Sequence, residues 1–355
     1  MVYTLPPSLK LMESTNTKKL APHVVADANI PFLEELLGET VRITRLPAPQ
    51  ITQGALSDAD ALITRTRTIC NRELLQDTPV KFIGTATIGT DHIDFDYCCQ
   101  NGINVVSAPG CNAPAVAQYV LSSILRLTDG TAPGNLTLGI VGVGHVGRIV
   151  ESWARSLGFK VLLCDPPRAV AEGQEGFVDL VTIAAECDII TFHTPHTTAG
   201  KFATHHLANS SFFNSLKRRP IIINSARGPI TDTDALLHAM GNKLTGPVII
   251  DCWEGEPDIN KRLLAETAYA TPHIAGYSIE GKQRASLTVA SALSEYFGLP
   301  FNPSIPMPGK ATETMTSQAI LESYDPAVDT LALRGNPENF EMLRNEYPLR
   351  HEPTL

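Results

Sequence analysis

Residues Thr137 to Asp165 have the sequence TLGIVGVGHVGRIVESWARSLGFKVLLCD, and the fold is predicted from them first. Its apolar run at 138–141 predicts a buried strand. The helical spacing of apolar residues from Val146 to Leu157 predicts a helix directly after a glycine-rich turn. A second apolar run, at 159–164, predicts another strand that ends at the acid. The order of strand, turn, helix and strand is typical of a parallel βαβ unit.

The turn between the first strand and the helix has the glycine spacing of a dinucleotide-binding site, GVGHVG at 142–147. Gly142 would allow the tight turn, Gly144 would let the backbone approach a pyrophosphate, and Gly147 would let the helix pack close to the strand. The free N–H groups at the helix start, at His145 and Val146, favour a bound anion, as does the helix dipole. The alternative is a tight turn that binds no ligand, but the flanking strands, helix and acid favour a dinucleotide site.

The acid at the end of the second strand bears on which dinucleotide binds. Asp165 lies 23 residues beyond Gly142, where it is placed to accept hydrogen bonds from the adenosine ribose and to repel a 2′-phosphate. Arg168 follows closely in the sequence, and we interpret it as a solvated loop charge rather than a phosphate ligand. The sequence therefore predicts NAD as the cofactor rather than NADP.

Composition places the chain among ordinary globular proteins, with 355 residues, 43% hydrophobic and 18% charged. A formal net charge of −9 argues against nucleic acid as a partner. The sequence has no apolar run of about 18 residues that would span a membrane, and residues 1–22 lack the pattern of a secretory signal. The seven cysteines show no CxxC or zinc-like spacing. We therefore expect a cytoplasmic protein with reduced thiols.

Alternating strands and helices surround the glycine turn on both sides. Before it, strands are expected at 23–26, 41–43, 60–63, 81–84 and 104–106. After it, further strands are expected at 188–192, 220–224, 247–251 and 268–271. The longest expected helices are at 113–127 and 280–297. The prediction is an α/β fold with two Rossmann-like or flavodoxin-like parallel-sheet domains around a cleft, plus a small C-terminal appendage.

We expect three parts along the chain. Residues 22–112, together with a returning helix at 282–298, would form a substrate domain, and residues 119–277 would form an NAD-binding Rossmann domain. Four prolines between 299 and 309 mark the next boundary. Residues 310–355 have a mixed composition and are expected to form a small C-terminal region or a dimer contact.

Three strand ends of the second domain carry residues that suit hydride transfer from a 2-hydroxy acid, since ligands bind at the carboxyl ends of strands in open α/β sheets. Arg227 could bind the substrate carboxylate with two charge-assisted hydrogen bonds, and His273 could take the hydroxyl proton as the hydride leaves. Glu256 could accept from the other ring nitrogen and stabilise the charged imidazole. The alternatives are a surface ion pair for Arg227 and an ordinary loop position for His273. The three residues are expected at one edge of the sheet, beside the glycine turn, and this shared location favours the catalytic interpretation.

With these motifs the chain resembles the D-isomer-specific 2-hydroxyacid dehydrogenases. The matching segments are GVGHVG with Asp165, SARG with Arg227, DCWEGEP with Glu256 and TPHIAGY with His273. In that family the Arg, Glu and His of these motifs form the catalytic set. FIGTATIGTDHID at 82–94 and APGCNAPAVAQYV at 108–120 are similar to one branch, which oxidises 4-phospho-D-erythronate on the route to pyridoxal 5′-phosphate. The resemblance covers residues 23–298 well and is loose over most of the remainder.

The resemblance also implies contacts with the cofactor and the substrate. It places the cofactor against Asp165, Thr194, Ser225, Ala226, Arg227, Asp251 and Gly276. It assigns substrate contacts to Thr66, Thr87 and Tyr277. The residues themselves agree with a phosphate-binding end, because Arg65 and Thr66 follow one expected strand and Thr87 follows the next. The alternative is that these are ordinary exposed loop residues.

Two other functions stay open at this point. Another D-2-hydroxyacid dehydrogenase, acting on phosphoglycerate or on glyoxylate and hydroxypyruvate, would differ at the phosphate-binding end. A non-enzymatic NAD-sensing interaction protein could use the same fold, although the intact set of Arg227, Glu256 and His273 argues against it.

The expected partners are a phosphorylated 2-hydroxy acid and a second copy of the chain in a homodimer, with no nucleic acid and no membrane. No metal is expected. His205 and His206 are adjacent and lack the i, i+4 spacing of ligands on one helix face. His193 is expected to line the cofactor site instead.

Overall fold

The computed structural model describes residues 21–306, 308–309 and 312–354. Within the described residues the chain divides into two units. Unit 1 comprises the first segment, up to Cys111, and Lys282–Pro308; unit 2 comprises Asn112–Gly281 and the last segment, from Gly309. The predicted fold class is confirmed, because each unit is built on a parallel sheet with helices on both of its faces.

Unit 1 contains a five-stranded parallel sheet with the strand order β2-β1-β3-β4-β5. Its strands are β1 (His23–Asp27), β2 (Arg42–Leu46), β3 (Ala61–Thr64), β4 (Phe82–Thr85) and β5 (Asn104–Ser107). Every residue of β1, β3 and β4 is buried. Parallel strands covered on both faces need such continuous apolar runs, which explains why these segments were predictable.

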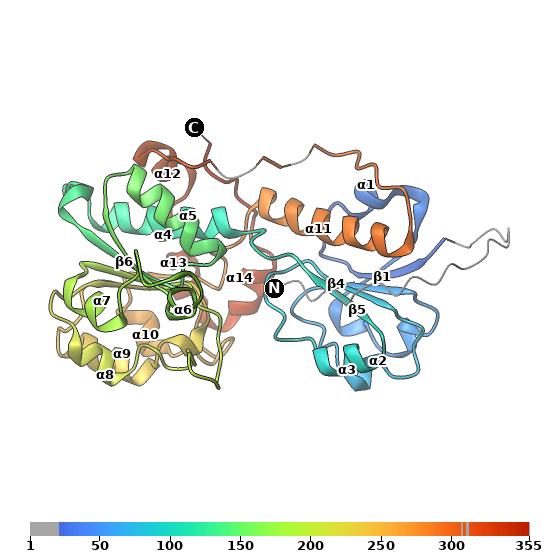
Figure 1. Ribbon diagram of the computed structural model, residues 1–355, viewed down its shortest axis with the longest axis horizontal. Helices are drawn as coiled ribbons and strands as arrows, with labels where there is room; N and C mark the ends of the chain where they lie inside the picture. Colours follow the sequence, from blue (N-terminus) through green and yellow to red (C-terminus); the bar gives the residue numbers. More distant parts are fainter. Residues whose placement is uncertain (1–20, 307, 310–311, 355) are drawn as a thin grey trace. The chain divides into compact units, whose positions relative to one another are not determined.

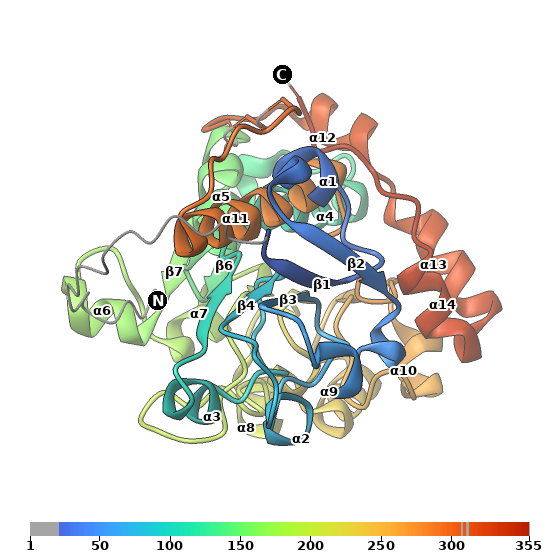
Figure 2. The same ribbon diagram turned by 90° about the vertical axis from the view of Figure 1, so that its right-hand side faces the viewer.

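Helices cover both faces of the unit 1 sheet. On one face lie α1 (Leu33–Leu37) and residues 282–297 of α11 (Ile279–Phe297), and on the other lie α2 (Arg72–Leu75) and α3 (Phe95–Gln100) (Figure 1, Figure 2). The helix α11 packs closely on β4 because Gly84 has no side chain. A Cβ at Gly84 would lie only 2.2 Å from Cγ1 of Val289.

Unit 2 contains a six-stranded parallel sheet with the strand order β11-β10-β9-β8-β6-β7. Its strands are β6 (Thr137–Val141), β7 (Lys160–Cys164), β8 (Ile189–Phe192), β9 (Ile221–Asn224), β10 (Val248–Ile250) and β11 (Tyr269–Ala270). The helices of its first face are α4 (Ala113–Leu127) and α5 (His145–Ser156). Those of its second face are α7 (Leu180–Glu186), α8 (Ser210–Ser215), α9 (Thr233–Gly241) and α10 (Lys261–Glu266) (Figure 1).

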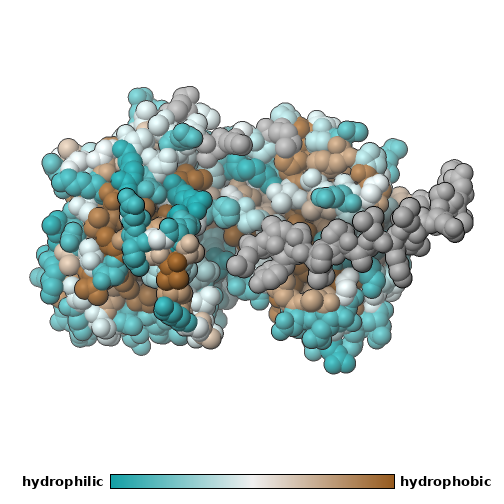
Figure 3. All heavy atoms as spheres, viewed as in Figure 1, coloured by the Kyte–Doolittle hydropathy of each residue, from teal (hydrophilic) through white to brown (hydrophobic). Residues whose placement is uncertain are grey.

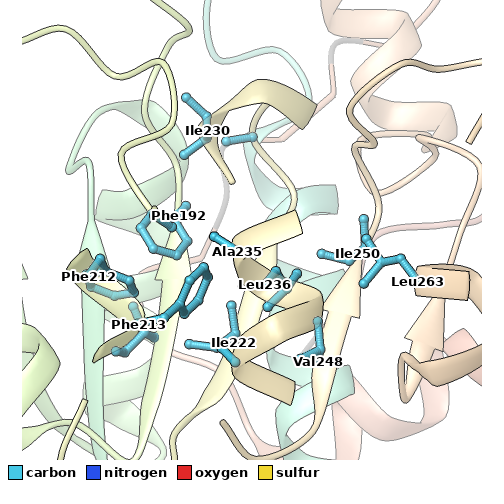
Figure 4. Close-up of a cluster of buried hydrophobic side chains, with 14 of the residues drawn as sticks. Phe192, Phe212, Phe213, Ile222, Ile230, Ala235, Leu236, Val248, Ile250 and Leu263 are labelled. Carbon is cyan, nitrogen blue, oxygen red and sulfur yellow. The ribbon is translucent and has the colours of Figure 1, made fainter. Parts of the chain in front are cut away.

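Each face of the unit 2 sheet has its own apolar core. Figure 4 shows the second-face core, in which Phe192 and Ile222 of the sheet meet Phe213 of α8 and Leu236 of α9. The first-face core contains the fully buried Trp153 of α5 among its members. Burial on both faces fixes the sheet, and the sheet in turn fixes the loops at its carboxyl edge.

Short helices complete the chain. The helix α6 (Pro166–Glu172) follows β7 in the sequence. The 3-10 helices are η1 (Gly38–Thr40), η2 (Ala48–Gln50), η3 (Gly54–Leu56), η4 (Pro133–Asn135), η5 (Gly228–Ile230) and η6 (Pro337–Asn339).

The C-terminal region is helical and belongs to unit 2. It contains α12 (Ser317–Ser323), α13 (Pro326–Gly335) and α14 (Phe340–Asn345). Ile320 of α12 is buried in the first-face core, whereas Leu333 of α13 and Phe340 of α14 are buried in the second-face core. These three buried side chains attach the C-terminal region to the unit 2 cores, although its sequence has no clear hydrophobic periodicity.

The surface mixes polar and apolar side chains. On the face drawn in Figure 3, hydrophilic residues surround scattered hydrophobic ones. None of the helices in the described part of the chain has both the length and the apolar character to cross a membrane.

Candidate active site

The carboxyl ends of the unit 2 strands share one edge, because all six strands run in parallel. The glycine turn follows β6 at this edge. The loops that carry Arg227, Glu256 and His273 follow β9, β10 and β11. The three predicted catalytic residues therefore follow strand ends of the kind at which open α/β sheets bind ligands.

The glycine turn depends on the absence of side chains at two of its positions. Gly142 has a φ of +91°, and a Cβ there would lie 2.8 Å from the backbone N of Thr194. A Cβ on Gly147 would lie 2.2 Å from the carbonyl oxygen of Gly142, so glycine lets α5 start this close to β6. At Gly144 the Cβ position faces open space. The turn thus offers an open approach to the start of α5, at His145 and Val146, as a pyrophosphate requires.

Asp165 ties the end of β7 to the glycine turn. One carboxylate oxygen accepts a hydrogen bond from the Val143 N–H at 2.8 Å, and the other accepts from the Arg168 N–H at 3.0 Å and caps α6. These contacts fix a carboxylate beside the turn. Its hydrogen bonds to a ribose stay a prediction.

The interpretation of Arg168 as a solvated loop charge is wrong. Its Nη1 donates to the Val143 carbonyl at 2.8 Å, and its Nε and Nη2 donate to the two carboxylate oxygens of Glu172 at 2.8 and 2.6 Å. The guanidinium also lies over the ring of Phe177, 5.1 Å from its centroid. This pair was not predicted from the sequence, because no helix was expected at 166–172, and it is the helix α6 that places Arg168 and Glu172 on one face.

Buried hydroxyl groups in this region fit a polar ligand. The Oγ atoms of Thr194 and Ser225 are buried and have no hydrogen-bond partner among the described residues. Burying an unpaired hydroxyl costs free energy, so an acceptor or donor from a bound molecule would stabilise each one. Both are predicted cofactor contacts, and together with the open glycine turn they fit a dinucleotide. His193 lies beside them at the end of β8, and burial lowers its pKa to about 3, so its ring is neutral.

The turn that carries Arg227 is shaped by Asn224, a residue that the sequence analysis did not select. The Asn224 side chain donates to the carbonyls of Arg227 at 3.0 Å and Gly228 at 3.4 Å and accepts from the Ala226 N–H at 3.1 Å. Arg227 itself donates from Nη1 to the Ala226 carbonyl at 2.8 Å. An asparagine directly at a strand end is a turn former, and that signal could have identified it.

Glu256 and His273 form a close pair within unit 2. The Nδ1 of His273 and Oε1 of Glu256 are 2.6 Å apart, and the other carboxylate oxygen accepts from the Trp253 N–H at 3.2 Å. His273 has a φ of +57°, a left-handed conformation that residues other than glycine seldom adopt and that clusters at functional sites. Burial opposes ionisation of Glu256, but the hydrogen bond from His273 and nearby positive charge outweigh it and lower the Glu256 pKa.

The strained loop at His273 is held by Asp251, which is itself fully buried. Its carboxylate accepts from the Ile274 N–H at 2.7 Å, the Ala275 N–H at 3.0 Å and the Thr271 hydroxyl at 2.6 Å. Its backbone carbonyl accepts from the His273 N–H at 2.9 Å. Burial raises the pKa of Asp251. In this structure Asp251 braces the loop, and its predicted cofactor contact stays a prediction.

Gly276 lies further along the same loop. A Cβ at this position would lie 2.1 Å from Nδ2 of Asn112, at the start of α4. The close approach explains why this predicted cofactor contact is a glycine. Tyr277 follows it, and its ring packs against that of Tyr347 with centroids 6.1 Å apart.

A second pair outside the prediction holds the segment that precedes Glu256. Glu254 accepts from His206 Nε2 at 2.6 Å and from the Thr233 N–H at 3.1 Å. The rings of His205 and His206 stack with centroids 4.0 Å apart. The part of the chain that the structure describes contains no cluster of three or more His, Cys, Asp or Glu arranged to hold a metal ion.

The predicted phosphate-binding residues belong to unit 1 and follow adjacent strands of its sheet. Arg65 follows β3, and its Nε lies 3.2 Å from an oxygen of the fully buried Asp27. Thr66 is exposed next to it. Thr87, which follows β4, shares a hydrogen bond of 2.7 Å with the Thr85 hydroxyl and donates to the Gly89 carbonyl at 3.0 Å. Asp27 was not selected from the sequence, although it ends a buried strand.

Comparison with known proteins identifies relatives over nearly the whole chain. Residues 123–275 match the model of the D-isomer specific 2-hydroxyacid dehydrogenase NAD binding domain. The chain is 45% identical over 337 residues to an erythronate-4-phosphate dehydrogenase of Bacteroides thetaiotaomicron, covering 93% of this chain and 97% of the relative. It is 40% identical over 339 residues to the one of Porphyromonas gingivalis, covering 92% of each chain.

Solved structures share the fold. The NAD+-bound 3-phosphoglycerate dehydrogenase of Entamoeba histolytica matches with a TM-score of 0.66 and 25% identity, over 78% of this chain and 96% of that one. The D-lactate dehydrogenase of Aquifex aeolicus, complexed with NAD and lactic acid, matches with a TM-score of 0.63 and 24% identity, over 78% of this chain and 95% of that one.

Proposed function

The chain belongs to the D-isomer-specific 2-hydroxyacid dehydrogenase family, and on that premise we propose that it oxidises 4-phospho-D-erythronate at C2. The product is 3-hydroxy-2-oxo-4-phosphooxybutanoate, and the reaction belongs to the biosynthesis of pyridoxal 5′-phosphate. The erythronate-4-phosphate dehydrogenases, at 40–45% identity over more than nine-tenths of the chain, support this substrate over phosphoglycerate or glyoxylate.

The cofactor is NAD. When bound, it supplies the acceptor for the hydride that leaves C2. On the protein side, the glycine turn and the start of α5 would hold the pyrophosphate, and Asp165 would accept from the adenosine ribose. The unpaired buried hydroxyls of Thr194 and Ser225 would find polar partners on the same molecule.

The observation that carries the mechanism is the contact of 2.6 Å between His273 Nδ1 and Glu256 Oε1. With Nδ1 held by the carboxylate, Nε2 of His273 is left to take the proton of the C2 hydroxyl as the hydride departs. The imidazole becomes positively charged in this step, and the adjacent Glu256 carboxylate stabilises that charge. The positive φ of His273 supports this role, because strained backbone is retained where function needs it.

The remaining roles concern binding of the substrate. Arg227 would grip the C1 carboxylate through its planar guanidinium, which matches a carboxylate with two parallel hydrogen bonds. Arg65, Thr66 and Thr87 would bind the phosphate group, with Tyr277 as a further substrate contact. Arg65 and Thr66 follow β3 and Thr87 follows β4, and these strands are neighbours in the unit 1 sheet, which supports a shared role at its carboxyl edge.

We also propose a homodimer and a cytoplasmic location. Val328 and Leu331 of α13 are 66% and 71% exposed, and Met342 of α14 is 46% exposed. Val328 and Leu331 are three residues apart and therefore lie on one face of α13, and exposed apolar side chains that lie together are a frequent mark of a protein interface. The mass of the protein in solution tests the dimer. The free cysteines, most of them buried, are as expected for a protein from a reducing compartment.

The deciding experiment measures turnover of 4-phospho-D-erythronate beside 3-phospho-D-glycerate and D-glycerate, with NAD+ and purified protein. A 2-oxo acid is included to reoxidise bound NADH, and the oxidised product is followed directly. The His273→Ala variant serves as the control for the base. We expect a strong preference for the four-carbon phosphate and a loss of about 10²–10⁴-fold in the variant, the usual contribution of a general base.

The other outcomes would lead to different functions. Turnover of phosphoglycerate instead would keep the mechanism and overturn the substrate. Binding of NAD without turnover of any 2-hydroxy acid would favour the NAD-sensing protein.

A further inference from the structure

Arg344 of the C-terminal region contacts the Glu256–His273 pair, although more than 70 residues of sequence separate it from His273. Its Nη1 lies 3.7 Å from Oε1 of Glu256, the same oxygen that pairs with His273 Nδ1. The Arg344 side chain is only 14% exposed and the Glu256 side chain 24%. Both charges are therefore largely removed from water, and their interaction is stronger than that of a surface pair.

The C-terminal region holds this arginine in place. Arg344 lies near the end of α14, which is anchored by the buried Phe340 in the second-face core of unit 2. Beyond the helix, Arg350 donates to the carbonyl of Ile274 at 3.1 Å and to that of Ala275, the two residues after His273. Its guanidinium also lies over the ring of Tyr324, 4.3 Å from the centroid. The same short segment therefore contacts Glu256 through the charge of Arg344, and the backbone of the two residues that follow His273 through Arg350.

The charge of Arg344 resolves an electrostatic conflict at the pair. A buried carboxylate alone beside an imidazole favours the protonated ring, and a protonated ring cannot accept the hydroxyl proton. A guanidinium on the same carboxylate offsets that preference. Burial by itself would lower the pKa of Arg344, but Tyr277 and Glu256 raise it above its ordinary value, so the compensating charge is permanent.

We propose that Arg344 is a positioning residue of the reaction: its guanidinium compensates the buried Glu256 carboxylate and keeps it on His273 Nδ1, so that the imidazole is free to act as a base at neutral pH. The inference rests on the proposed function, since it takes His273 as the base. It also assigns the C-terminal region a part in the active site, where the sequence offered no chemistry. The other ionisable groups beside the pair include Asp251, which is buried and braces the loop, Tyr277 next to Arg344, and the buried thiol of Cys252, which also interacts with Arg227.

The test compares Arg344→Gln and Arg344→Lys with wild type across pH 5 to 9. Removing the positive charge raises the proton affinity of the Glu256–His273 pair, because the protonated pair carries one more positive charge. We expect the acidic limb of kcat/KM in Arg344→Gln to move to higher pH by about 0.5–1 unit, the size expected for one charge at this range in a partly buried site. Lysine keeps the positive charge, so the acidic limb in Arg344→Lys should lie close to its wild-type position.

Arg334→Gln is the matched control. Arg334 also lies in the C-terminal region, on α13, and donates to the carbonyls of Leu264 and Thr267 rather than to the pair. This variant should lower the melting temperature without moving the pH limb. An equal loss of activity at every pH in Arg344→Gln, with the limb unmoved, would reduce Arg344 to a structural role. A raised KM with an unmoved limb would make it a substrate ligand instead.

A second readout keeps the inference separate from the substrate. NMR titration of the His273 ring in wild type, Arg344→Gln and Arg334→Gln needs neither NAD nor a hydroxy acid. An upward shift of the His273 titration in Arg344→Gln alone supports the proposal even if 4-phospho-D-erythronate is not turned over. Unchanged titration in all three proteins overturns it whatever the substrate proves to be.

Discussion

At the scale of single residues, three charges near the end of β7 bear on the choice between NAD and NADP. Asp165 is fixed by its hydrogen bonds to the backbone of Val143 and Arg168. Arg168 would attract a 2′-phosphate if it were free, but Glu172 takes it in a two-point ion pair. The Glu172 pKa is lowered by this hydrogen bond from Arg168. Two negative charges therefore oppose NADP, one of them by neutralising the arginine.

We predict that Asp165→Asn combined with Glu172→Gln raises the preference for NADP+ over NAD+ by about tenfold for each charge removed, because both negative charges act against a 2′-phosphate. Asparagine is as good a helix N-cap as aspartate, so α6 should keep its start. The ratio of kcat/KM for the two cofactors measures the effect. Glu175→Gln, an exposed carboxylate in the loop after α6, is the control and should leave the ratio unchanged. A double variant with the wild-type ratio would show that these charges do not select the cofactor.

Among the elements of unit 2, the glycine turn meets two different requirements: close packing of α5 on β6, and an open approach for a ligand. Gly147 serves the packing of α5 on β6, because a Cβ there meets the Gly142 carbonyl at 2.2 Å. Gly144 is the N-cap of α5 and has open space at the same position, so no packing contact among the described residues requires it to be glycine. What remains for Gly144 is the ligand.

This difference predicts opposite results for two alanine substitutions. Gly147→Ala should destabilise the protein by about 1–3 kcal/mol, as overpacking typically does, and weaken NAD binding as a consequence. Gly144→Ala should cost no more than about 1 kcal/mol of stability, since Gly144 is the N-cap of α5 and alanine caps a helix less well. It should weaken NAD binding by about tenfold or more, because the methyl group occupies the approach of the pyrophosphate. Chemical denaturation and NAD titration measure the two effects. Loss of stability in Gly144→Ala with unchanged NAD affinity would contradict this division of roles.

The elements that the sequence predicted well are those whose burial pattern is local. Most strands of the two sheets are short apolar runs, although β2 is not, and α4 begins and ends at the predicted residues, Ala113 and Leu127. The helices α13 and α14 gave no clear pattern, because they are held by single side chains, Leu333 and Phe340, docked into a distant core.

The same difference applies to the candidate site. The glycine turn and the strand-end motifs could be located from local sequence, and the expected contact of Glu256 with His273 is present, while its catalytic role stays a prediction. The brace at Asp251 and the approach of Arg344 depend on contacts between segments far apart in the chain. Pattern and spacing carry no information on such contacts.

At the scale of the whole molecule, the pH dependence of folding follows from groups that change pKa on burial. Glu256 has a lowered pKa despite its burial, so its stabilising contribution is present above about pH 4.5, the ordinary value for a glutamate, and is lost as the pH falls further. His193 affects the stability of the protein in a higher pH range. Burial lowers its pKa to about 3, whereas an unfolded histidine titrates near 6.5, so the unfolded chain binds a proton first. Acid should therefore begin to destabilise unit 2 while its carboxylates are still ionised.

We predict that the free energy of unfolding decreases as the pH falls from about 6.5 towards 3, with a contribution from His193 of at most about 2 kcal/mol at pH 5. His193→Gln removes the titrating group and can keep a hydrogen bond to Thr191, which now lies 3.0 Å from His193 Nε2. Its stability should therefore fall less than that of wild type between pH 7 and 5, and the remaining loss is expected from His92, whose pKa burial also lowers. Thermal melts across this range measure the difference, with His238→Gln as the control, because the His238 ring lies at the surface of α9. If His193→Gln loses as much stability as wild type over this range, another buried group must bind the proton, and the neutral ring of His193 cannot be the origin of the acid sensitivity.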